Sequence, residues 1–346
     1  AYLFKNLKAR QQATAAAVAV LVSNMVGVTM AFAGFAYWAL ATQNLIYVAV
    51  NIGIQWHYSP WRPTLHGITF APVRRMFRFS CKVLATTIVN HVNNNVLNIL
   101  LGHYFSPRDT GNFNQAYQWN MKSYSLVQSM ILQVAQPVLV GLDDDADRQL
   151  RVFRKMVRFT SFVTFPLLFG FALVSREFIV IALTEKWLAS ASLLQLLCIS
   201  GAVMPLCALF NNMVVSKGRS DILLWCTFSL GLLLTLMMLV IWPWGIHTMV
   251  VAFVVINVSW LFVWLYFVRR LTGYGYLMFA RDVLPFAIAA VAVMSLTYFA
   301  TQSIQNLWIL LLSRIAIAAT AYYAVMRVAH VAILDECIDF IRGKMK

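Results

Sequence analysis

Polar side chains recur along one apolar stretch of the sequence, residues 89–100, which read VNHVNNNVLNIL. Amide side chains donate and accept hydrogen bonds without ionising, so their chemistry is recognition rather than acid–base catalysis. At about 100° per residue, five of the polar positions share one arc of roughly 140° on a helix, which Lys82, Thr86 and Asn93 extend on one side. With one lysine from the preceding turns, this face comprises Lys82, Asn90, His91, Asn94, Asn95 and Asn98. Unpaired polar groups are unfavourable in hydrocarbon, so the face is predicted to contact something other than lipid.

The next apolar stretch, residues 113–140, carries a second and narrower polar face. Its members fall on an arc of about 100° and are Asn114, Gln115, Gln118, Lys122, Ser125, Ser129, Gln133 and Gln136. A third, weaker stripe runs through Asn44, Asn51 and Gln55. Helix packing alone is one explanation, since polar side chains join membrane helices by hydrogen bonds of about 0.6–2 kcal/mol. Two consecutive polar faces, one with a lysine, instead favour a hydrated cavity.

The elements that carry these faces are predicted to be membrane-spanning helices. Hydrophobic residues make up 61% of the 346 positions and charged residues 11%, whereas soluble domains are about 45–50% apolar and about 25% charged. The mean hydropathy is +0.73. A helical span needs roughly 20 apolar residues. About ten such spans are predicted, near 12–34, 36–56, 79–101, 113–140, 158–175, 189–215, 222–242, 246–268, 283–302 and 306–330. The fold class is therefore an all-α integral membrane protein, a polytopic helix bundle.

The net charge of +15 follows the expected membrane topology. Its distribution does not indicate a nucleic-acid-binding surface. Basic residues concentrate in every second predicted loop and in the tail, represented by Lys5, Arg74, Arg148, Arg151, Arg154, Lys155, Arg158, Lys217, Arg269, Arg270, Arg281 and Lys346. The opposite loops hold only Arg108, Arg176 and Lys186. The positive-inside rule makes the basic side cytoplasmic, with both ends of this chain on it. Some attraction to anionic membrane lipids is also expected.

Charges inside the predicted spans are few. The twelve carboxylates, Glu177 and Asp282 among them, are assigned to loops, span edges or the tail. Lys122 therefore has no expected acidic partner, and a cavity with an unpaired cation suits an anionic substrate. Arg314, in the last span, is expected to extend toward the outer surface instead.

Catalysis is not predicted. The outer loops are short, and the sequence lacks a Gly-rich phosphate loop, HExxH and GxSxG. The stretch SKGRSD at 216–221 is interpreted as a tight basic turn between two helices. The five cysteines have no CxxC spacing and indicate neither a disulfide framework nor a metal site. No cofactor is expected.

An ordered series of short motifs resembles a known transporter family. The series is LFKNLKARQQAT, GFAYWALATQ, SPWRP, LGHYFSPRDTGNFNQAYQWN, AQPVL, FPLLFG, LTEKW and SKGRSD. In this order the motifs are similar to those of Wzx-type polysaccharide flippases, in the multidrug/oligosaccharidyl-lipid/polysaccharide transporter superfamily. The resemblance covers most of residues 1–270.

The resemblance implies a two-lobe flippase or exporter architecture, with two six-helix lobes around a central cavity and an added helix pair. When the motifs are aligned with the helix order of this family, the ten spans correspond to helices five to fourteen, and the first lobe is incomplete. The implied domains are residues 1–58 (two helices of the first lobe), 59–78 (a cytoplasmic linker), 79–270 (the second lobe), 271–330 (the added pair) and 331–346 (a basic tail).

The resemblance also implies a function, the flipping of undecaprenyl-diphosphate-linked oligosaccharides across the bacterial inner membrane for surface polysaccharides such as O-antigen. Polysaccharide polymerase and chain-length proteins are implied as further partners. The amide faces would contact sugar hydroxyls, and Lys122 and Lys82 the diphosphate or an acidic sugar. Pro137, Pro166 and Pro205 are candidate bending points. The coupling ion stays open, with His91 as one titratable candidate.

Three alternatives remain at this point. A multidrug exporter of the same superfamily would favour a carboxylate in an aromatic cavity. A membrane polymerase or ligase would need a long outer loop with essential Arg, His or Glu residues. A non-transporting scaffold would tolerate loss of both polar faces.

Overall fold

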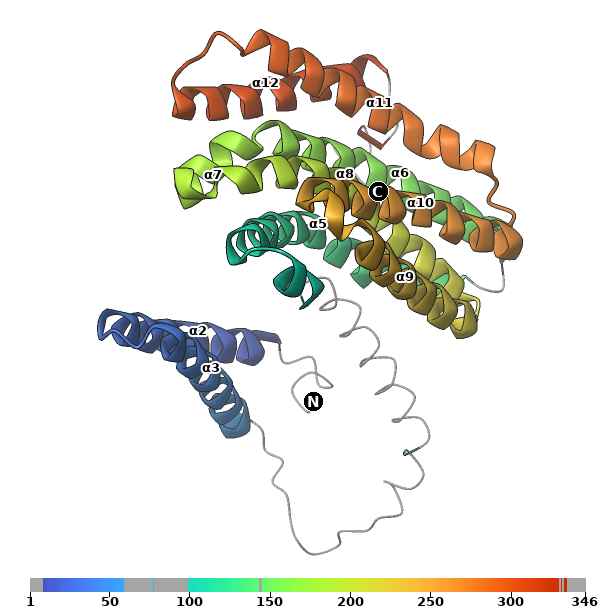
Figure 1. The fold of residues 1–346 in the computed structure, drawn as a ribbon. Coiled ribbons are helices and arrows are strands. Elements are labelled where there is room, and N and C mark those ends of the chain that lie inside the picture. The colour runs from blue at the N-terminus through green and yellow to red at the C-terminus, as the bar shows by residue number, and fades with distance from the viewer. Residues whose placement is uncertain are drawn as a thin grey trace, which may run out of the picture. The chain divides into compact units, whose positions relative to one another are not determined.

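The computed structural model describes residues 9–58, 99–142 and 145–329, together with residues 77, 331, 333 and 334. Its regular elements within these ranges are helices (Figure 1). The chain divides into two compact units, residues 1–80 (unit 1) and residues 81–346 (unit 2). A helical membrane bundle satisfies backbone hydrogen bonds within each helix, which explains why apolar sequences of this kind form helices.

Unit 1 is a hairpin of two helices, α2 (Ala9–Phe32) and α3 (Ala36–Tyr58). These helices match the first two predicted spans. The turn between them contains Gly34 at φ +84°, a left-handed conformation that glycine adopts without strain. The amide of Gln43 on α3 donates to the Asn24 side-chain oxygen on α2 at 2.6 Å and joins the two helices.

Unit 2 contains the remaining described helices. They are α5 (Pro107–Gly141), α6 (Ala146–Leu173), α7 (Ser175–Leu183), η1 (Glu185–Trp187), α8 (Leu188–Ser216), α9 (Ser220–Ile241), η2 (Trp242–Trp244), α10 (Ile246–Thr272), α11 (Tyr276–Ala300) and α12 (Leu307–Val328). The α8–α9 connection turns at Gly218, with φ +70°, so SKGRSD is a tight turn as predicted.

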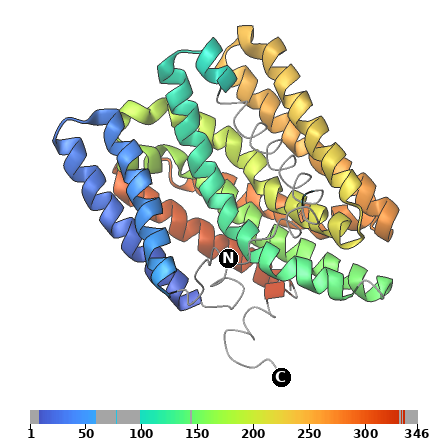
Figure 2. The same cartoon turned by 90° about the horizontal axis from the view of Figure 1, so that it is seen from below.

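Helix α8 lies at the centre of unit 2, with α5, α6 and α10 packed around it. Helix α9 packs on α10, and α11 packs on α6 with α12 beside it (Figures 1 and 2). Most of α8 is accordingly buried. Pro137 lies inside α5, Pro166 inside α6 and Pro205 inside α8, so all three candidate bending points occur within continuous helices.

Four aromatic rings define one end of unit 2, here called the basic end. Phe153 of α6 contacts Phe210 of α8 and Tyr274 of the α10–α11 connection, at centroid distances of 5.5 and 5.4 Å. Phe279 of α11 lies 6.1 Å from Phe210. Because these rings come from the start of α6, the end of α8 and the α10–α11 corner, the basic segments of all three meet there.

The predicted boundary of one basic loop was wrong. Helix α6 begins at Ala146 rather than near residue 158, so the cluster from Arg148 to Arg158 is helical. Asp145 caps the helix by accepting a hydrogen bond from the Arg148 backbone N–H at 2.9 Å. Hydropathy finds the end of an apolar run, whereas a capped helix rich in Arg and Lys continues beyond the hydrocarbon. Asp282 is likewise inside α11 and not in a loop.

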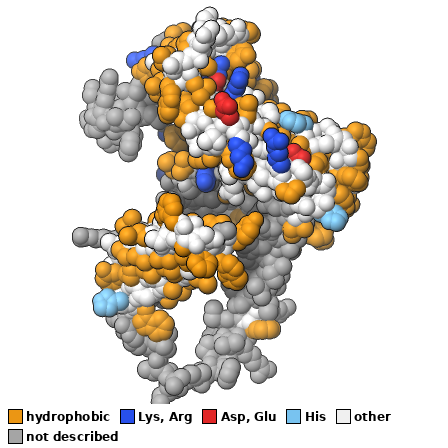
Figure 3. Space-filling model, turned by 60° about the vertical axis from the view of Figure 1, so that its left-hand side comes forward, with side chains coloured by type: hydrophobic (Ala, Val, Ile, Leu, Met, Phe, Trp, Pro, Cys, Tyr) orange, Lys and Arg blue, Asp and Glu red, His pale blue; other side chains and the backbone are white. Residues whose placement is uncertain are grey.

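Seven helical segments are long and apolar enough to cross a membrane, among the described residues. They are Ala13–Phe32, Ala146–Leu173, Glu185–Ser216, Asp221–Trp244, Ile246–Thr272, Tyr276–Ala300 and Leu307–Val328. Helices α3 and α5 also match predicted spans but are more polar, and the span 79–101 lies mostly outside the described residues. Apolar side chains cover much of the surface visible in Figure 3. The chain is thus a polytopic helical membrane protein.

Candidate functional site

The predicted site residues divide into two sets. Lys82, Asn90, His91, Asn94, Asn95 and Asn98 lie outside the described residues. Gln118, Lys122, Ser125, Ser129 and Gln133 lie on α5, although the Gln133 side chain is not described. The candidate site is therefore built from α5.

The start of α5 is fixed by a local capping arrangement. Ser106 is the N-cap, and its hydroxyl oxygen accepts a hydrogen bond from the Asp109 backbone N–H at 3.1 Å. Pro107 occupies the first helical turn, where its missing N–H is not needed. The helix has 35 residues, a length of about 52 Å that exceeds a hydrocarbon core of about 30 Å.

One face of α5 packs into unit 2. Besides Asn112 near its start, its buried residues recur at spacings of three, four and seven and are Phe113, Ala116, Asn120, Val127, Ile131, Ala135 and Leu139. Their main neighbour is α8. At the far end, the Gln149 amide of α6 donates to the Leu139 carbonyl at 2.7 Å. This packing fixes the rotation of α5 about its own axis.

The opposite face is exposed within unit 2 and carries polar residues. Gln118, Lys122, Ser125 and Ser129 follow at spacings of four, three and four, and all four are exposed. Leu126 and Met130 are also exposed and border this row. The side chains of Gln118, Lys122, Ser125 and Ser129 are called the α5 polar face below.

Lys122 is the only charged member of the α5 polar face. Its ammonium nitrogen lies 4.7 Å from the ring centre of Trp119, one helical turn earlier. Trp119 is held in turn by an edge contact with Phe178 of α7, at 4.8 Å between ring centres. No carboxylate pairs with Lys122 among the residues that the structure describes. A cation held by an aromatic face keeps its N–H donors available for an anion.

The two serines of this face direct their hydroxyl protons back to the helix. Ser125 donates to the Lys122 carbonyl at 3.0 Å, and Ser129 donates to the Leu126 carbonyl at 2.9 Å. Their oxygen lone pairs remain outward as acceptors. Together with the Gln118 amide, the face therefore offers both acceptors and donors to a hydroxyl-rich ligand.

Asn120, on the buried side of α5, was not identified from the sequence. It is 2% exposed, and its side-chain oxygen has no hydrogen-bond partner among the residues that the structure describes. The oxygen lies directly over Gly201 of α8, where an added Cβ would be only 2.2 Å away. A search for polar residues off the main arc would have found Asn120, but only the packed helices identify its glycine partner.

Asp282 forms a buried charge cluster at the basic end. Its side chain is 2% exposed and accepts from Arg154 Nε at 2.8 Å, Arg154 Nη2 at 3.1 Å and Arg158 Nε at 2.7 Å. The Tyr274 hydroxyl donates at 3.2 Å. Burial, followed by the negative charge of Asp282, raises the pKa of Tyr274, so its hydroxyl stays protonated and remains a donor. The sequence placed Asp282 beside the predicted span 283–302; the structure places it in the second turn of α11, buried and paired with arginines of α6.

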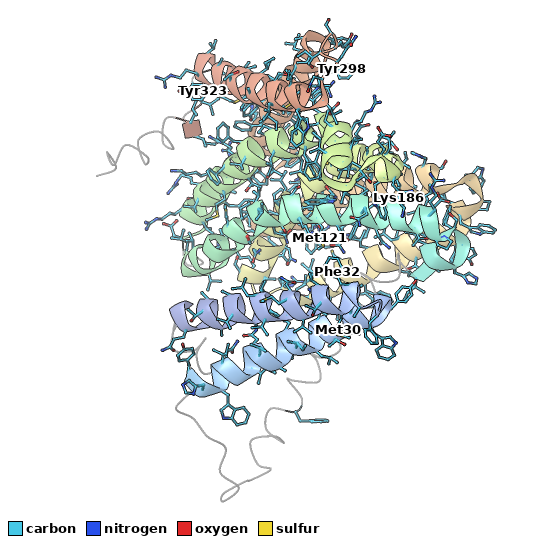
Figure 4. The ribbon with its side chains drawn as sticks, turned by 90° about the vertical axis from the view of Figure 1, so that its left-hand side faces the viewer. Met30, Phe32, Met121, Lys186, Tyr298 and Tyr323 are labelled. Carbon is cyan, nitrogen blue, oxygen red and sulfur yellow. The ribbon has the colours of Figure 1, made fainter. Side chains whose placement is uncertain are left out.

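Arg314 extends toward the predicted outer loops, since it contacts Glu177 and Thr301, but its guanidinium is buried there instead of reaching the surface. The Arg314 side chain is 8% exposed and pairs with Glu177 of α7 at 2.9 Å. It also donates to the Thr301 hydroxyl and the Leu173 carbonyl, each at 3.2 Å, and lies 5.4 Å from the Tyr298 ring centre (Tyr298 is labelled in Figure 4). A partner 137 positions earlier in the chain is invisible to local sequence patterns.

Arg314 borders an apolar groove between α6 and α12. The groove encloses about 590 Å³, and its lining includes Phe162, Pro166, Ala318 and Tyr322. The polar side-chain groups of Arg314, Phe162, Pro166, Ala318 and Tyr322 are the paired guanidinium of Arg314 and the Tyr322 hydroxyl. That hydroxyl donates to the Phe162 carbonyl at 3.1 Å. The groove therefore lacks the acid–base pair that hydrolysis or group transfer would need.

The amide stripe of α3 has local partners. The Asn44 amide donates to the Leu40 carbonyl at 3.1 Å, and the Gln55 amide donates to Asn51 at 2.8 Å. On α2, Gly27 leaves room for Gln43, because an added Cβ would lie 3.1 Å from its amide carbon. In unit 1, then, these polar residues either join the two helices or form hydrogen bonds within one helix.

Comparison with protein families gives a match over more than half of the chain. The family described as "Polysaccharide biosynthesis protein" matches residues 1–192. The chain is 26% identical over 204 residues to the lipopolysaccharide biosynthesis protein WzxC of Escherichia coli (strain K12), covering 57% of this chain and 41% of that protein. It is 29% identical over 150 residues to the teichuronic acid biosynthesis protein TuaB of Bacillus subtilis (strain 168), covering 43% and 31%. Each match spans less than half of the relative's length.

The fold is similar to that of a solved transporter. The lipid II flippase MurJ, in an inward closed conformation, superposes with a TM-score of 0.73 over 92% of this chain and 68% of its own. The sequence identity is 13%, so the likeness concerns the fold. It agrees with the flippase-like helical architecture expected from the sequence.

Proposed function

The chain belongs to the polysaccharide biosynthesis protein family of membrane flippases, which are transporters rather than enzymes, and from this we propose that it moves lipid-linked oligosaccharides across the bacterial inner membrane. The proposed cargo is an oligosaccharide repeat unit on an undecaprenyl diphosphate carrier, delivered for surface polysaccharide synthesis. The names of the relatives support this substrate class, since they refer to lipopolysaccharide, teichuronic acid and lipid II.

The single observation that carries the proposal is the α5 polar face. Gln118, Ser125 and Ser129 present neutral donors and acceptors, which match sugar hydroxyls without selecting one sugar. Lys122 adds one positive charge without a described carboxylate beside it, which matches a diphosphate or an acidic sugar. A cationic drug would be repelled by the same residue, so the observation disfavours a multidrug exporter.

Transport would require the polar face to open to each side of the membrane in turn. In this proposal the sugar and diphosphate pass along α5 while the lipid chain stays in the bilayer. Alternating access of this kind is common among transporters built from two bundles. The asparagine-rich segment 79–101 would supply further amides to the passage.

The test is a sidedness measurement in the host. The gene is deleted, and lipid-linked oligosaccharide is quantified on the two faces of the inner membrane in intact and opened spheroplasts. We expect accumulation on the cytoplasmic face and loss of surface polysaccharide. Single repeat units accumulating on the outer face would contradict the proposal, because that outcome is expected of a missing polymerase or ligase.

A further inference from the structure

The buried carboxylate of Asp282 is saturated with donors but neutralises only one of its two arginines. Its two oxygens accept four hydrogen bonds, three from Arg154 and Arg158 and one from Tyr274. A carboxylate has about four lone-pair sites, so no acceptor capacity remains. Arg158 bonds Asp282 through Nε alone, and its side chain is 43% exposed. The cluster therefore keeps one net positive charge at the surface of the basic end.

Further cations surround this cluster. Arg151 is exposed and shares the α6 face of Arg154 and Arg158, at spacings of three and seven residues. Arg281, also exposed, directly precedes Asp282 on α11. At the α10–α11 corner, Arg269 lies over the Tyr276 ring at 5.1 Å and Arg270 over the Tyr266 ring at 5.0 Å. Arginine beside tyrosine is typical of the membrane–water interface.

The described acids nearest in sequence to this α6 face lie too far along the helix to neutralise Arg158. Asp145 uses its carboxylate to cap α6, and Asp147 lies exposed in the first helical turn. Both precede Arg158 by about three turns or more, a separation of roughly 16 Å or more along the axis. Asp221, on α9, pairs with its neighbour Arg219 at 2.8 Å.

The position of Arg158 along α6 allows its side chain to reach the level of the lipid phosphates. About 20 helical residues cross a hydrocarbon core of about 30 Å. If the hydrocarbon begins at Leu173, the other end of α6, a span of about 20 residues ends near Arg154. Arg158 therefore lies about one turn inside the boundary, within reach of the headgroup level for a long side chain.

Apolar side chains are exposed next to these cations. Phe159 is 42% exposed on α6, and Leu277 and Leu284 are 66% and 49% exposed on α11. A ligand that contacts both sets of residues must combine an anionic group with long apolar chains. That combination favours a phospholipid over a soluble phosphate, which has no apolar chains.

We propose that Arg158 and Arg281, at the α6–α11 surface of the basic end, bind the phosphate of an anionic bilayer phospholipid whose chains lie against the exposed apolar residues of α6 and α11. The buried Asp282 orients Arg158 through Nε and leaves both terminal nitrogens for the phosphate. This lipid is a bound membrane component rather than the transported cargo, and its site is separate from the α5 polar face.

The test compares two lipids that differ in headgroup charge. The detergent-solubilised full chain is titrated with dioleoylphosphatidylglycerol or dioleoylphosphatidylcholine, and bound lipid is counted by native mass spectrometry. We expect a preference for the anionic lipid of about tenfold or more. The double variant Arg158→Gln/Arg281→Gln should lose this preference. The matched control Arg108→Gln/Arg176→Gln removes two exposed arginines from the other end and should keep it.

Three outcomes would overturn the proposal: no preference in the wild-type chain, equal loss in the control, or displacement of the lipid by millimolar inorganic phosphate. The last result would assign the site to free anions. If the double variant does not fold, Arg281→Gln alone is measured, since Arg281 is exposed on α11. Its preference should fall severalfold, and 0.5 M salt should weaken lipid binding to the wild type. An unchanged preference in both measurements also contradicts the proposal.

Discussion

At the scale of single residues, the proposed transport function depends most on Lys122. We predict that Lys122→Gln lowers surface polysaccharide production about tenfold or more, because a charge-assisted contact to a diphosphate is worth about 1.5–3 kcal/mol. Lys122→Arg should retain most activity, since it keeps the charge. The measurement is complementation of the deletion strain at matched protein levels.

Lys186→Gln provides the control for charge alone. Lys186 lies exposed in η1 (labelled in Figure 4) and is not part of the α5 polar face. It should complement like the wild type. Equal activity of Lys122→Gln and the wild type would remove the main support for the proposed ligand contact.

Gly201 is the residue whose replacement should most disturb the packing of α5. Gly201→Ala places a methyl group 2.2 Å from the Asn120 side-chain oxygen. We predict a loss of about 1–3 kcal/mol in unfolding free energy from overpacking. The added change Asn120→Ala should restore part of this stability, because it removes the clashing oxygen. Thermal unfolding in detergent measures both effects.

The matched control for this cycle is Gly141→Ala. Beyond its own helix and chain neighbours, no atom of the described residues lies within 4 Å of a Cβ at Gly141, which ends α5. Its melting temperature should stay close to that of the wild type. Additive effects of Gly201→Ala and Asn120→Ala would show that the two residues do not interact.

At the scale of elements, the attachment of α11 to α6 rests on a buried ion cluster. Asp282→Asn should lower the unfolding free energy by about 3–5 kcal/mol, because it leaves two arginines without a carboxylate at a largely buried site. Asp221→Asn breaks the exposed pair Arg219–Asp221, whose side chains are 50% and 57% exposed, and should not change the melting temperature measurably. Similar melting temperatures for both variants would contradict this account.

The attachment of α12 to α7 also depends on a buried ion pair, Arg314–Glu177. Glu177→Gln should destabilise the protein by about 3–5 kcal/mol, since Arg314 is buried and loses its counter-charge. The double variant Glu177→Met/Arg314→Met should recover most of that stability, because apolar replacements of buried pairs are often neutral. Chemical unfolding of the three proteins gives the comparison. Stability of the double variant below that of the single variant would argue against the pair.

At the scale of the whole molecule, the charge bias predicts the orientation in the membrane. In a background with the five cysteines replaced by serine, Asp147→Cys at the basic end and Lys186→Cys at the other end are labelled with a membrane-impermeant maleimide. Lys186→Cys should react in intact spheroplasts, and Asp147→Cys should react only after the membrane is opened. The reverse pattern would show that the basic end faces outward.

The sequence by itself determined the features that depend on local periodicity and composition. Membrane helices, the α5 polar face and the turn at Gly218 follow from patterns within one helical segment. Motif order also indicated the flippase family, which the family comparison confirms. These features need no knowledge of which helices are neighbours.

Only the tertiary structure decided which charges meet. Asp282 lies 128 residues from Arg154, and Arg314 lies 137 residues from Glu177, so no local pattern pairs them. Hydropathy scores each window alone, so it placed Asp282 at a span edge and Arg314 in the last span without indicating a partner for either residue. In the folded chain, α11 packs on α6, and Arg314 of α12 meets Glu177 of α7, each bringing a buried carboxylate within reach of a guanidinium. A buried charge is tolerated only when such a partner is present, and partner choice is a property of helix packing.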